Sequence, residues 1–184
     1  MKFTVRPATA EDATTIARVH VDSWRSTYAG MLPEKMLLKL SSAWHETRWW
    51  RHVLVRFRHK HIVYVAEYDA DGVVGFGSAG AARDHNLPYR GEIYALYLLD
   101  AYHGAGIGKA LMGALSADLS SSRGLSMVVW VLGSNPSRFF YEAIGGQRVA
   151  TRVDRKGGVE VEEIAYGWDD VSTLVTLGSP GGAE

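Results

Sequence analysis

The stretch with the clearest chemical potential is the glycine-rich segment His103–Lys109, which reads His-Gly-Ala-Gly-Ile-Gly-Lys. Its glycines allow the backbone to approach a ligand closely. The residues that follow predict a helix, because Ile107, Leu111 and Leu115 recur at helical spacing on one face. A helix that begins here would turn its unpaired N–H groups and the positive end of its dipole toward the ligand. The segment therefore predicts an anion site, and phosphate is the anion that such turns commonly bind.

Two common phosphate-binding motifs do not fit this turn. The dinucleotide fingerprint G-x-G-x-x-G fails because Lys109 stands where the third glycine belongs. The nucleotide-triphosphate loop G-x-x-x-x-G-K-[ST] fails because Gly104 and Gly108 are too close and Ala110 follows the lysine, which leaves no hydroxyl for Mg²⁺. A third pattern, [Q/R]-x-x-G-x-[G/A] at a strand-to-helix turn, fits from residue 103 to residue 108 except that histidine stands at its first position.

This third pattern resembles the turn of the GNAT superfamily of acetyl-CoA-dependent N-acetyltransferases. A second stretch, Val131–Gly146, is similar to the superfamily's N-x…-F-Y-E-x-x-G signature, with Asn135, Tyr141 and Gly145 on its named positions. Two signatures in the right order are more specific than either alone. The resemblance implies that the pyrophosphate of coenzyme A is held by the turn residues His103, Gly104, Ala105, Gly106, Ile107, Gly108 and Lys109.

The resemblance also implies roles in acetyl transfer. A backbone N–H at Leu98 would face the acetyl oxygen, while the pantetheine arm would pair with the strand edge at Leu96, Tyr97 and Leu98. Tyr141 matches the family's general acid, which protonates the thiolate of coenzyme A. Asn135 would contact the coenzyme or cap the helix that follows it. Because histidine replaces the usual Gln or Arg at the start of the turn, we expect coenzyme affinity to depend on pH.

Transfer to an amine requires the neutral amine, and a lysine-like amine has a pKa of about 10.4. Glu92 is the first candidate for the base, as in the histone-acetylating branch of the superfamily. It lies six residues before Leu98, so a period of two places both on one face of the strand. The alternative is a strand-end glutamate in water. Tyr94 shares the face of Glu92 and would act through water or line the pocket.

Residues 19–33 resemble the first-helix region of bacterial members of the superfamily, which forms part of the acceptor pocket. Trp24 and Tyr28 are therefore expected to be walls of that pocket.

The composition is that of one globular domain. The chain has 184 residues, of which 47% are hydrophobic and 22% charged, with 20 basic and 20 acidic residues. Zero net charge argues against a dedicated nucleic-acid or membrane-surface protein, and the absence of cysteine excludes disulfides, thiolate metal sites and a Cys nucleophile. His59 and His61 alternate without a third ligand at a suitable spacing, so no metal is expected. No signal peptide or membrane span is visible, and we expect a cytoplasmic protein. Its Trp-rich helices offer a surface for a homodimer.

The periodicities predict an α/β fold (α+β, mixed sheet) in the order β-α-α-β-β-β-α-β-α-β-β. It is similar to the GNAT acyl-CoA N-acyltransferase fold over residues 3–168, in which the parallel strands carrying Leu98 and Val129 splay apart and hold the cofactor in the gap. Residues 1–170 are predicted to form the single domain and residues 171–184 a tail, disordered at its end. Helices are expected at 9–24, 33–40, 42–57, 107–119 and 136–144, with a loop at 23–30; strands are expected at 3–6, 62–67, 73–81, 93–99, 125–132, 147–153 and 159–168.

The resemblance predicts an enzyme that moves the acetyl group of acetyl-CoA directly to a primary amine of a small molecule, peptide or protein. A non-catalytic acyl-CoA sensor of the same fold is the first alternative. The second is a nucleotide binder outside this family that uses the same glycine turn, and it predicts binding of ATP or NAD in preference to coenzyme A.

Overall fold

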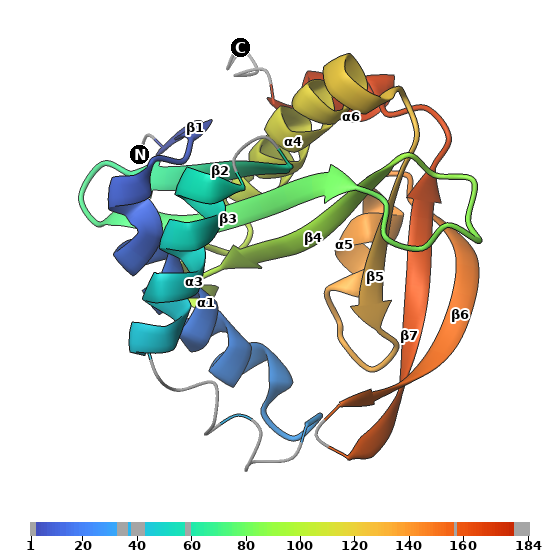
Figure 1. The fold of residues 1–184 in the computed structure, drawn as a ribbon, viewed down its shortest axis with the longest axis horizontal. Coiled ribbons are helices and arrows are strands. Elements are labelled where there is room, and N and C mark those ends of the chain that lie inside the picture. The colour runs from blue at the N-terminus through green and yellow to red at the C-terminus, as the bar shows by residue number, and fades with distance from the viewer. Residues whose placement is uncertain (1–2, 33–36, 38–42, 58–59, 157, 179–184) are drawn as a thin grey trace.

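A computed structural model describes residues 3–32, 37, 43–57, 60–156 and 158–178. They form one seven-stranded sheet in the order β1-β2-β3-β4-β5-β7-β6 (Figure 1). Within the described residues, β4 and β5 are the one parallel pair and all other neighbours are antiparallel. The expected α/β fold with a mixed sheet is confirmed. The strands run over Phe3–Pro7 (β1), His61–Tyr68 (β2), Gly72–Ala81 (β3), Gly91–Leu98 (β4), Met127–Leu132 (β5), Gln147–Lys156 (β6) and Val159–Trp168 (β7).

Helices cover both faces of the sheet (Figure 1). On one face, α1 and α3 pack on β2, β3 and β4 through a buried cluster that includes Ile16, Trp50 and Phe76. On the other face, α4 packs through Leu111 and Leu115. The helices are Ala13–Tyr28 (α1), Ala43–Arg56 (α3), Ile107–Arg123 (α4), Arg138–Ala143 (α5) and Ser172–Val175 (α6), with short 3-10 turns at Ala10–Asp12, Asp100–Tyr102 and Thr176–Gly178.

A capping box formed by Thr9 and Asp12 begins the 3-10 turn that leads into α1. The Thr9 backbone N–H donates to the Asp12 carboxylate at 2.7 Å, and the Arg6 guanidinium holds the same carboxylate through two bonds of 2.8 Å. The end of α1 differs from the sequence prediction, because the helix runs through the expected loop as far as Tyr28. Trp24 and Tyr28 are four residues apart, so the helix brings them onto one face with their rings 4.6 Å apart.

The parallel strands β4 and β5 separate after a short paired segment, which confirms the expected splay. They pair from Gly91 opposite Met127 to Ile93 opposite Val129, and no pairing follows along the rest of either strand within the described residues. A β-bulge lies where the strands part. Ser78 and Ala79 of β3 face Ala95 and Ile93 of β4, which leaves Tyr94 as the extra residue.

The segment after residue 170 packs against the domain, so the expected tail does not begin at residue 171. Val171 and Leu174 are 0% and 1% exposed and join the core cluster beside α4. Residues 179–184, the expected short helix at 33–40 apart from residue 37, the start of the next helix at Ser42, and His59 lie outside the described residues. Within the part of the chain that is described, no helix is both long and apolar enough to cross a membrane. The same residues hold no group of three or more His, Cys, Asp or Glu side chains placed to bind a metal ion.

Candidate active site

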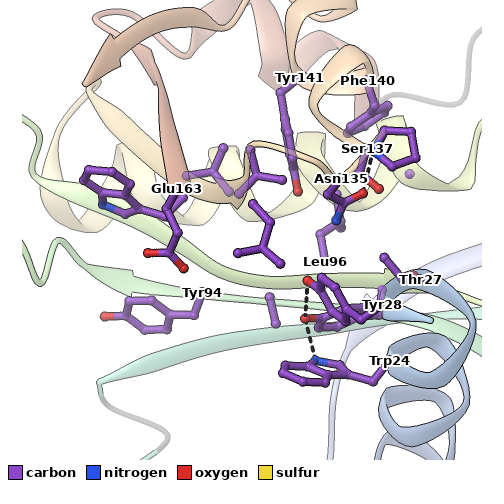
Figure 2. Close-up of a pocket in the computed structure, with 18 of the residues that line it drawn as sticks. Trp24, Thr27, Tyr28, Tyr94, Leu96, Asn135, Ser137, Phe140, Tyr141 and Glu163 are labelled. Atoms are coloured by element: carbon purple, nitrogen blue, oxygen red, sulfur yellow. Dashed lines mark hydrogen bonds between the residues drawn. The ribbon is translucent and has the colours of Figure 1, made fainter. Parts of the chain in front are cut away.

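A cavity of about 1540 Å³ occupies the gap between the splayed strands (Figure 2). Its walls come from the end of α1, the loop after β3, strands β4 and β5, the glycine turn before α4, the start of α5, and the β6–β7 hairpin. Segments far apart in the sequence therefore meet here. The cavity has one end at the glycine turn, around Gly104 and Gly106, and another at the hairpin, around Glu163 and Lys156.

The glycine turn is shaped to present its backbone to a ligand. Gly104 and Gly106 have φ values of 79° and 83°, in the left-handed region that favours glycine. No atom lies within 4 Å of the place where a Cβ would stand on either residue. The first intrahelical bond runs from the Ala110 N–H to the Gly106 carbonyl (3.1 Å), so the N–H groups of residues 107–109 have no helical acceptor. The side chain of Ile107 is buried in the core, so this residue offers a ligand only its backbone.

His103 connects this turn to β4. Its Nε2 lies 3.1 Å from the Leu98 carbonyl oxygen. A carbonyl oxygen only accepts hydrogen bonds, so Nε2 carries a hydrogen and donates it. His103 was expected to help bind the pyrophosphate, but its Nε2–H is used to hold the turn against β4. Lys109, one turn into α4, is exposed at the same end of the cavity.

The free edge of β4 faces the gap. The Leu99 N–H donates to the Val74 carbonyl of β3 at 3.0 Å. Because successive backbone groups of a strand point to alternate sides, the N–H groups of Leu98 and Leu96 point away from β3 and into the gap. The side chains of Leu96 and Leu98 pack on the α4 side of the sheet. Strand β4 thus offers backbone groups to a ligand at the positions where the pantetheine was expected.

Tyr97 was expected with the coenzyme, but its side chain lies with the residues expected to bind the acceptor. The Trp24 indole N–H donates to the Tyr97 hydroxyl at 2.8 Å, and the Tyr28 hydroxyl lies 3.5 Å from the same oxygen (Figure 2). Burial raises the pKa of Tyr97 well above its usual value. Burial also raises the pKa of Tyr28, while hydrogen bonds with Tyr97 and Asn135 lower it in part. Both phenols are therefore neutral near pH 7.

Tyr141 and Asn135 stand on the opposite wall of the gap. The Asn135 Oδ1 accepts a hydrogen bond from the Ser137 N–H at 2.8 Å and so shapes the turn before α5, whose N-cap is Ser137 and not Asn135. Tyr141 projects from α5 with its hydroxyl directed into the cavity (Figure 2). The residue is 6% exposed, and burial raises its pKa well above the usual range for tyrosine. Within the described residues, its hydroxyl has no hydrogen-bond partner.

Glu92 does not lie where its spacing from Leu98 predicts. The bulge at Tyr94 inserts one residue, so the period of two is broken and the two side chains lie on opposite faces of the sheet. Nor is Glu92 a strand-end glutamate in water, since it is 1% exposed. Its carboxylate accepts the Arg83 N–H at 2.8 Å, the Arg83 Nε–H at 3.0 Å and a third bond from Nη2. Both oxygens are thus engaged in fixing the loop after β3.

Tyr94 lines the cavity wall beside this pair. Its ring lies under the Arg83 guanidinium, 4.6 Å from centroid to Cζ, and its hydroxyl donates to the Ala81 carbonyl at 2.5 Å. Figure 2 shows the Tyr94 hydroxyl pointing away from Tyr28 and Tyr141. The sequence placed Tyr94 on the face of Glu92, and the common contact with Arg83 agrees with that placement.

Sequence analysis missed a group on the β6–β7 hairpin. Glu163 points its carboxylate into the cavity (Figure 2) and is 6% exposed. Arg152 donates to it from Nε at 2.8 Å, and Lys156 Nζ lies 2.9 Å from its other oxygen. The Arg152 guanidinium also stacks over the Trp130 ring at 4.0 Å. No local signal distinguishes Glu163 from Glu160 and Glu162 in the sequence. Only the pairing of β7 with β5 brings Glu163 to the cavity.

Comparisons with known proteins agree with this architecture. A family model described as "Acetyltransferase (GNAT) domain" matches residues 59–145. The protein named "Uncharacterized N-acetyltransferase YuaI" from Bacillus subtilis (strain 168) is 41% identical over 175 residues, which cover 95% of this chain and 97% of that protein.

Two solved structures of acetyltransferases share the fold at low sequence identity. The PaiA N-acetyltransferase of Thermoplasma acidophilum in complex with coenzyme A has a TM-score of 0.68 and 22% identity, over 89% of this chain and 98% of that one. The putative acetyltransferase YncA of Salmonella typhimurium with its cofactor acetyl-CoA also has a TM-score of 0.68, with 17% identity over 91% and 94% of the two chains.

Proposed function

The chain belongs to the GNAT acetyltransferase family, and we propose that it transfers the acetyl group of acetyl-CoA directly to a primary amine of a small molecule, peptide or protein. The observation that carries the proposal is the splayed β4–β5 gap with the open glycine turn at one end and the Tyr141 hydroxyl inside it. This arrangement provides a backbone anion site, a free strand edge and a proton donor along one cavity.

The coenzyme would lie along β4. Its pyrophosphate would accept hydrogen bonds from the backbone of the turn at Gly104–Gly108, where the positive end of the α4 dipole also favours an anion. The pantetheine amides would pair with the backbone groups of Leu96 and Leu98 that face the gap. The Leu98 N–H would then donate to the acetyl oxygen and stabilise the negative charge that develops there during attack.

Tyr141 would act as the general acid. The sulfur of coenzyme A gains negative charge as the C–S bond breaks, and a proton placed nearby lowers that barrier. Because burial raises the pKa of Tyr141, the phenol keeps its proton at neutral pH and can donate it to the sulfur as negative charge develops there. Its hydroxyl is directed into the cavity, where it can meet the sulfur.

Coenzyme binding is tested first by thermal unfolding with acetyl-CoA, ATP or NAD. A ligand at about 100 times its dissociation constant stabilises the folded state by roughly 2.7 kcal/mol. For a chain of this size, that corresponds to a rise in Tm of about 5–10 °C. A rise with acetyl-CoA alone supports the proposal. A rise with ATP or NAD and none with acetyl-CoA would refute it.

Turnover is tested with Tyr141→Phe, using thiol release from acetyl-CoA with a panel of primary amines. We expect kcat to fall by about 10²–10³-fold, within the range typical of general acids, while coenzyme affinity stays unchanged. Tyr166→Phe is the matched control, since this buried tyrosine packs against Tyr141 but donates its hydroxyl to Glu142 at 2.6 Å and does not line the cavity. Unchanged turnover in Tyr141→Phe would remove this residue from the mechanism. Coenzyme binding without transfer to any amine would favour an acyl-CoA sensor.

A further inference from the structure

Two buried carboxylates line the cavity on the sheet face opposite α4. Glu92 precedes Ile93 and Glu163 precedes Ile164, and both isoleucines pack on the α4 side. Because neighbouring side chains of a strand point to opposite faces, Glu92 and Glu163 point away from α4 and into the cavity. Neither carboxylate is available as a base. Glu92 is held by three hydrogen bonds from Arg83, and Glu163 is shared between two cations, Arg152 and Lys156. Both oxygens of each carboxylate are thus already occupied by donors of neighbouring side chains or backbone.

Neutral hydroxyls, in contrast, stand at the centre of the gap. Tyr97 on β4 and Tyr28 at the end of α1 bring their oxygens within 3.5 Å of each other. The Trp24 N–H can only donate, so it fixes the Tyr97 oxygen as an acceptor and orients that phenol. Tyr141 approaches from α5 and lines the same cavity as Tyr28 and Tyr97. Three phenols from three separate elements therefore surround the place where the thioester would lie.

The charged groups around this hydroxyl pair do not favour a cation. Lys156 and Glu163 on the hairpin both act on Tyr28, and they are paired with each other at 2.9 Å. His20 packs its ring against Tyr97 at 5.0 Å from the α1 side but does not line the cavity.

The other acidic side chains of the cavity are engaged as well: Asp84 accepts from Asn86 at 3.0 and 3.1 Å, Asp100 accepts from Ser26 at 3.1 Å, and Asp154 pairs with Lys156 at 2.9 Å. His85 and His103 also line the cavity, and His103 is bonded to the Leu98 carbonyl. An ammonium between the two tyrosine hydroxyls would lose hydration and meet only oxygens of neutral groups, whereas a neutral amine loses less hydration there.

We propose that the acceptor reacts as an amine that is already neutral when it binds, and that the hydroxyl oxygens of Tyr97 and Tyr28, instead of a carboxylate base, hold its nitrogen against the thioester. This rests on the acetyltransferase function proposed above. The two tyrosines accept N–H hydrogen bonds from the amine and leave its lone pair directed at the carbonyl carbon.

The proton balance of the reaction does not require a protein base when the amine binds in its neutral form. The nitrogen lone pair forms the C–N bond, the C–S bond breaks, and the electron pair leaves with sulfur. A neutral primary amine loses one proton as it becomes an amide, and the leaving thiolate gains one proton as it becomes a thiol. The two changes cancel, so the phenols only need to pass one proton from nitrogen to sulfur, with Tyr141 as the last donor.

This arrangement selects a chemical class of acceptor. Near pH 7, an α-amino group with a pKa of about 8 is roughly one-tenth neutral, whereas a lysine-type amine with a pKa of about 10.4 is neutral in only about one molecule in 2500. The site therefore suits amines of lowered basicity, such as the α-amino group of an amino acid or peptide, by about 250-fold in the concentration of the reactive form.

The test follows thiol release from acetyl-CoA with glycinamide and with n-propylamine, which are similar in size but differ in amine pKa because the amide group withdraws electrons. We measure kcat/KM from about pH 6 to about pH 10 and expect it to rise around the pKa of each amine. When kcat/KM is calculated from the concentration of the neutral amine alone, it should no longer depend on pH. In Glu92→Gln, the rise should stay at the same pH for each amine. A rise shared by both amines below about pH 7 would overturn the proposal and restore a protein base, which would be Glu92 if the rise is lost in Glu92→Gln.

Substitution of the hydroxyls tests their role. Tyr97→Phe and Tyr28→Phe should each lower kcat/KM by about tenfold to a hundredfold and leave the coenzyme dissociation constant unchanged. Tyr64→Phe is the matched control, because this tyrosine on neighbouring β2 donates to Asp118 at 3.1 Å and does not line the cavity. Since Tyr97→Phe leaves the Trp24 N–H unpaired, unfolding temperature is measured for each variant, and Tyr28→Phe gives an independent result. Full activity in both variants would overturn the proposal.

Acetyl-CoA binding and thiol release test the proposed function, while the position of the pH dependence tests this inference. Acetyl transfer whose kcat/KM rises below about pH 7 for both amines would refute this inference and leave the proposed function standing. If the wild-type protein does not bind acetyl-CoA, the proposed function itself is refuted.

Discussion

Replacing Gly106 by alanine separates the role of the turn in beginning α4 from its proposed role in holding an anion. Gly106 is the N-cap of α4, with φ 83° and ψ −6°. A side chain in this left-handed conformation costs about 1–2 kcal/mol. Alanine also restricts the unfolded chain, which returns about 0.4–1 kcal/mol. The net loss of stability is therefore about 1 kcal/mol, equivalent to a fall in Tm of about 2–4 °C.

The effect on coenzyme binding should be larger than this loss. No protein atom lies within 4 Å of the added methyl group, so it does not clash with the fold. It would instead occupy the space in which we place the pyrophosphate. An anion at a helix N-terminus gains about 0.3–2 kcal/mol from the dipole, and each hydrogen bond to a charged group contributes about 1.5–3 kcal/mol. Losing about 1.4–2.7 kcal/mol of this corresponds to a rise in the acetyl-CoA dissociation constant of about 10–100-fold.

Gly158→Ala is the control for the backbone cost. Gly158 lies in the turn between β6 and β7 with φ 87°, and it too has no atom within 4 Å of the added methyl position. Both variants should lose similar stability by thermal unfolding, but only Gly106→Ala should lose affinity for acetyl-CoA by calorimetric titration. Wild-type affinity in Gly106→Ala, or an equal loss in Gly158→Ala, would refute the placement of the pyrophosphate at this turn.

Three further substitutions test parts of the fold. Hydrogen bonds from Arg6 lower the pKa of Asp12, so this carboxylate stabilises the fold at pH values above its ordinary pKa of about 3.9 and loses that effect as the pH falls below it. Asp12→Asn should therefore lower the free energy of unfolding by about 1–3 kcal/mol near pH 7. An equal loss at about pH 3 would contradict this origin. Gly146→Ala would place its methyl 2.6 Å from the Trp168 ring and should cost about 1–3 kcal/mol, measured by urea unfolding. His103→Ala removes one hydrogen bond to β4 and should weaken acetyl-CoA binding by about 2–10-fold in the same titration.

The sequence was sufficient for the features that depend on local pattern. Apolar periodicity predicted the strands of the hairpins and the helix that starts at Ile107. The splayed parallel pair was implied by the resemblance to the GNAT fold. The two signature stretches lie at the positions expected from them, in the glycine turn and in α5. The proposed roles of their residues stay predictions, but the shape of the turn agrees with them because glycine alone adopts its positive φ values at low cost.

Other features depend on contacts between distant segments. The end of α1 reads as a loop because its polar residues interrupt the apolar stripe. It stays helical while Trp24 and Tyr28 pack on each other and hydrogen-bond toward β4. Gly146 has no side chain, and the Trp168 ring fills the space beside it. In each case the stabilising partner comes from another part of the chain, so a local pattern cannot show it.

The bulge at Tyr94 has the greatest consequence for the chemistry. No glycine or proline marks it, and a strand with a strict period of two would point Glu92 along the face of Leu98. One extra residue reverses that orientation and directs Glu92 to the loop after β3, where Arg83 engages both of its oxygens. The same residue marks the point at which β4 leaves β5. A single local irregularity therefore lies where the gap begins and turns Glu92 toward Arg83, on the face opposite Leu98, which is why we look to the tyrosine hydroxyls, and to the acceptor's own ionisation, for control of the amine.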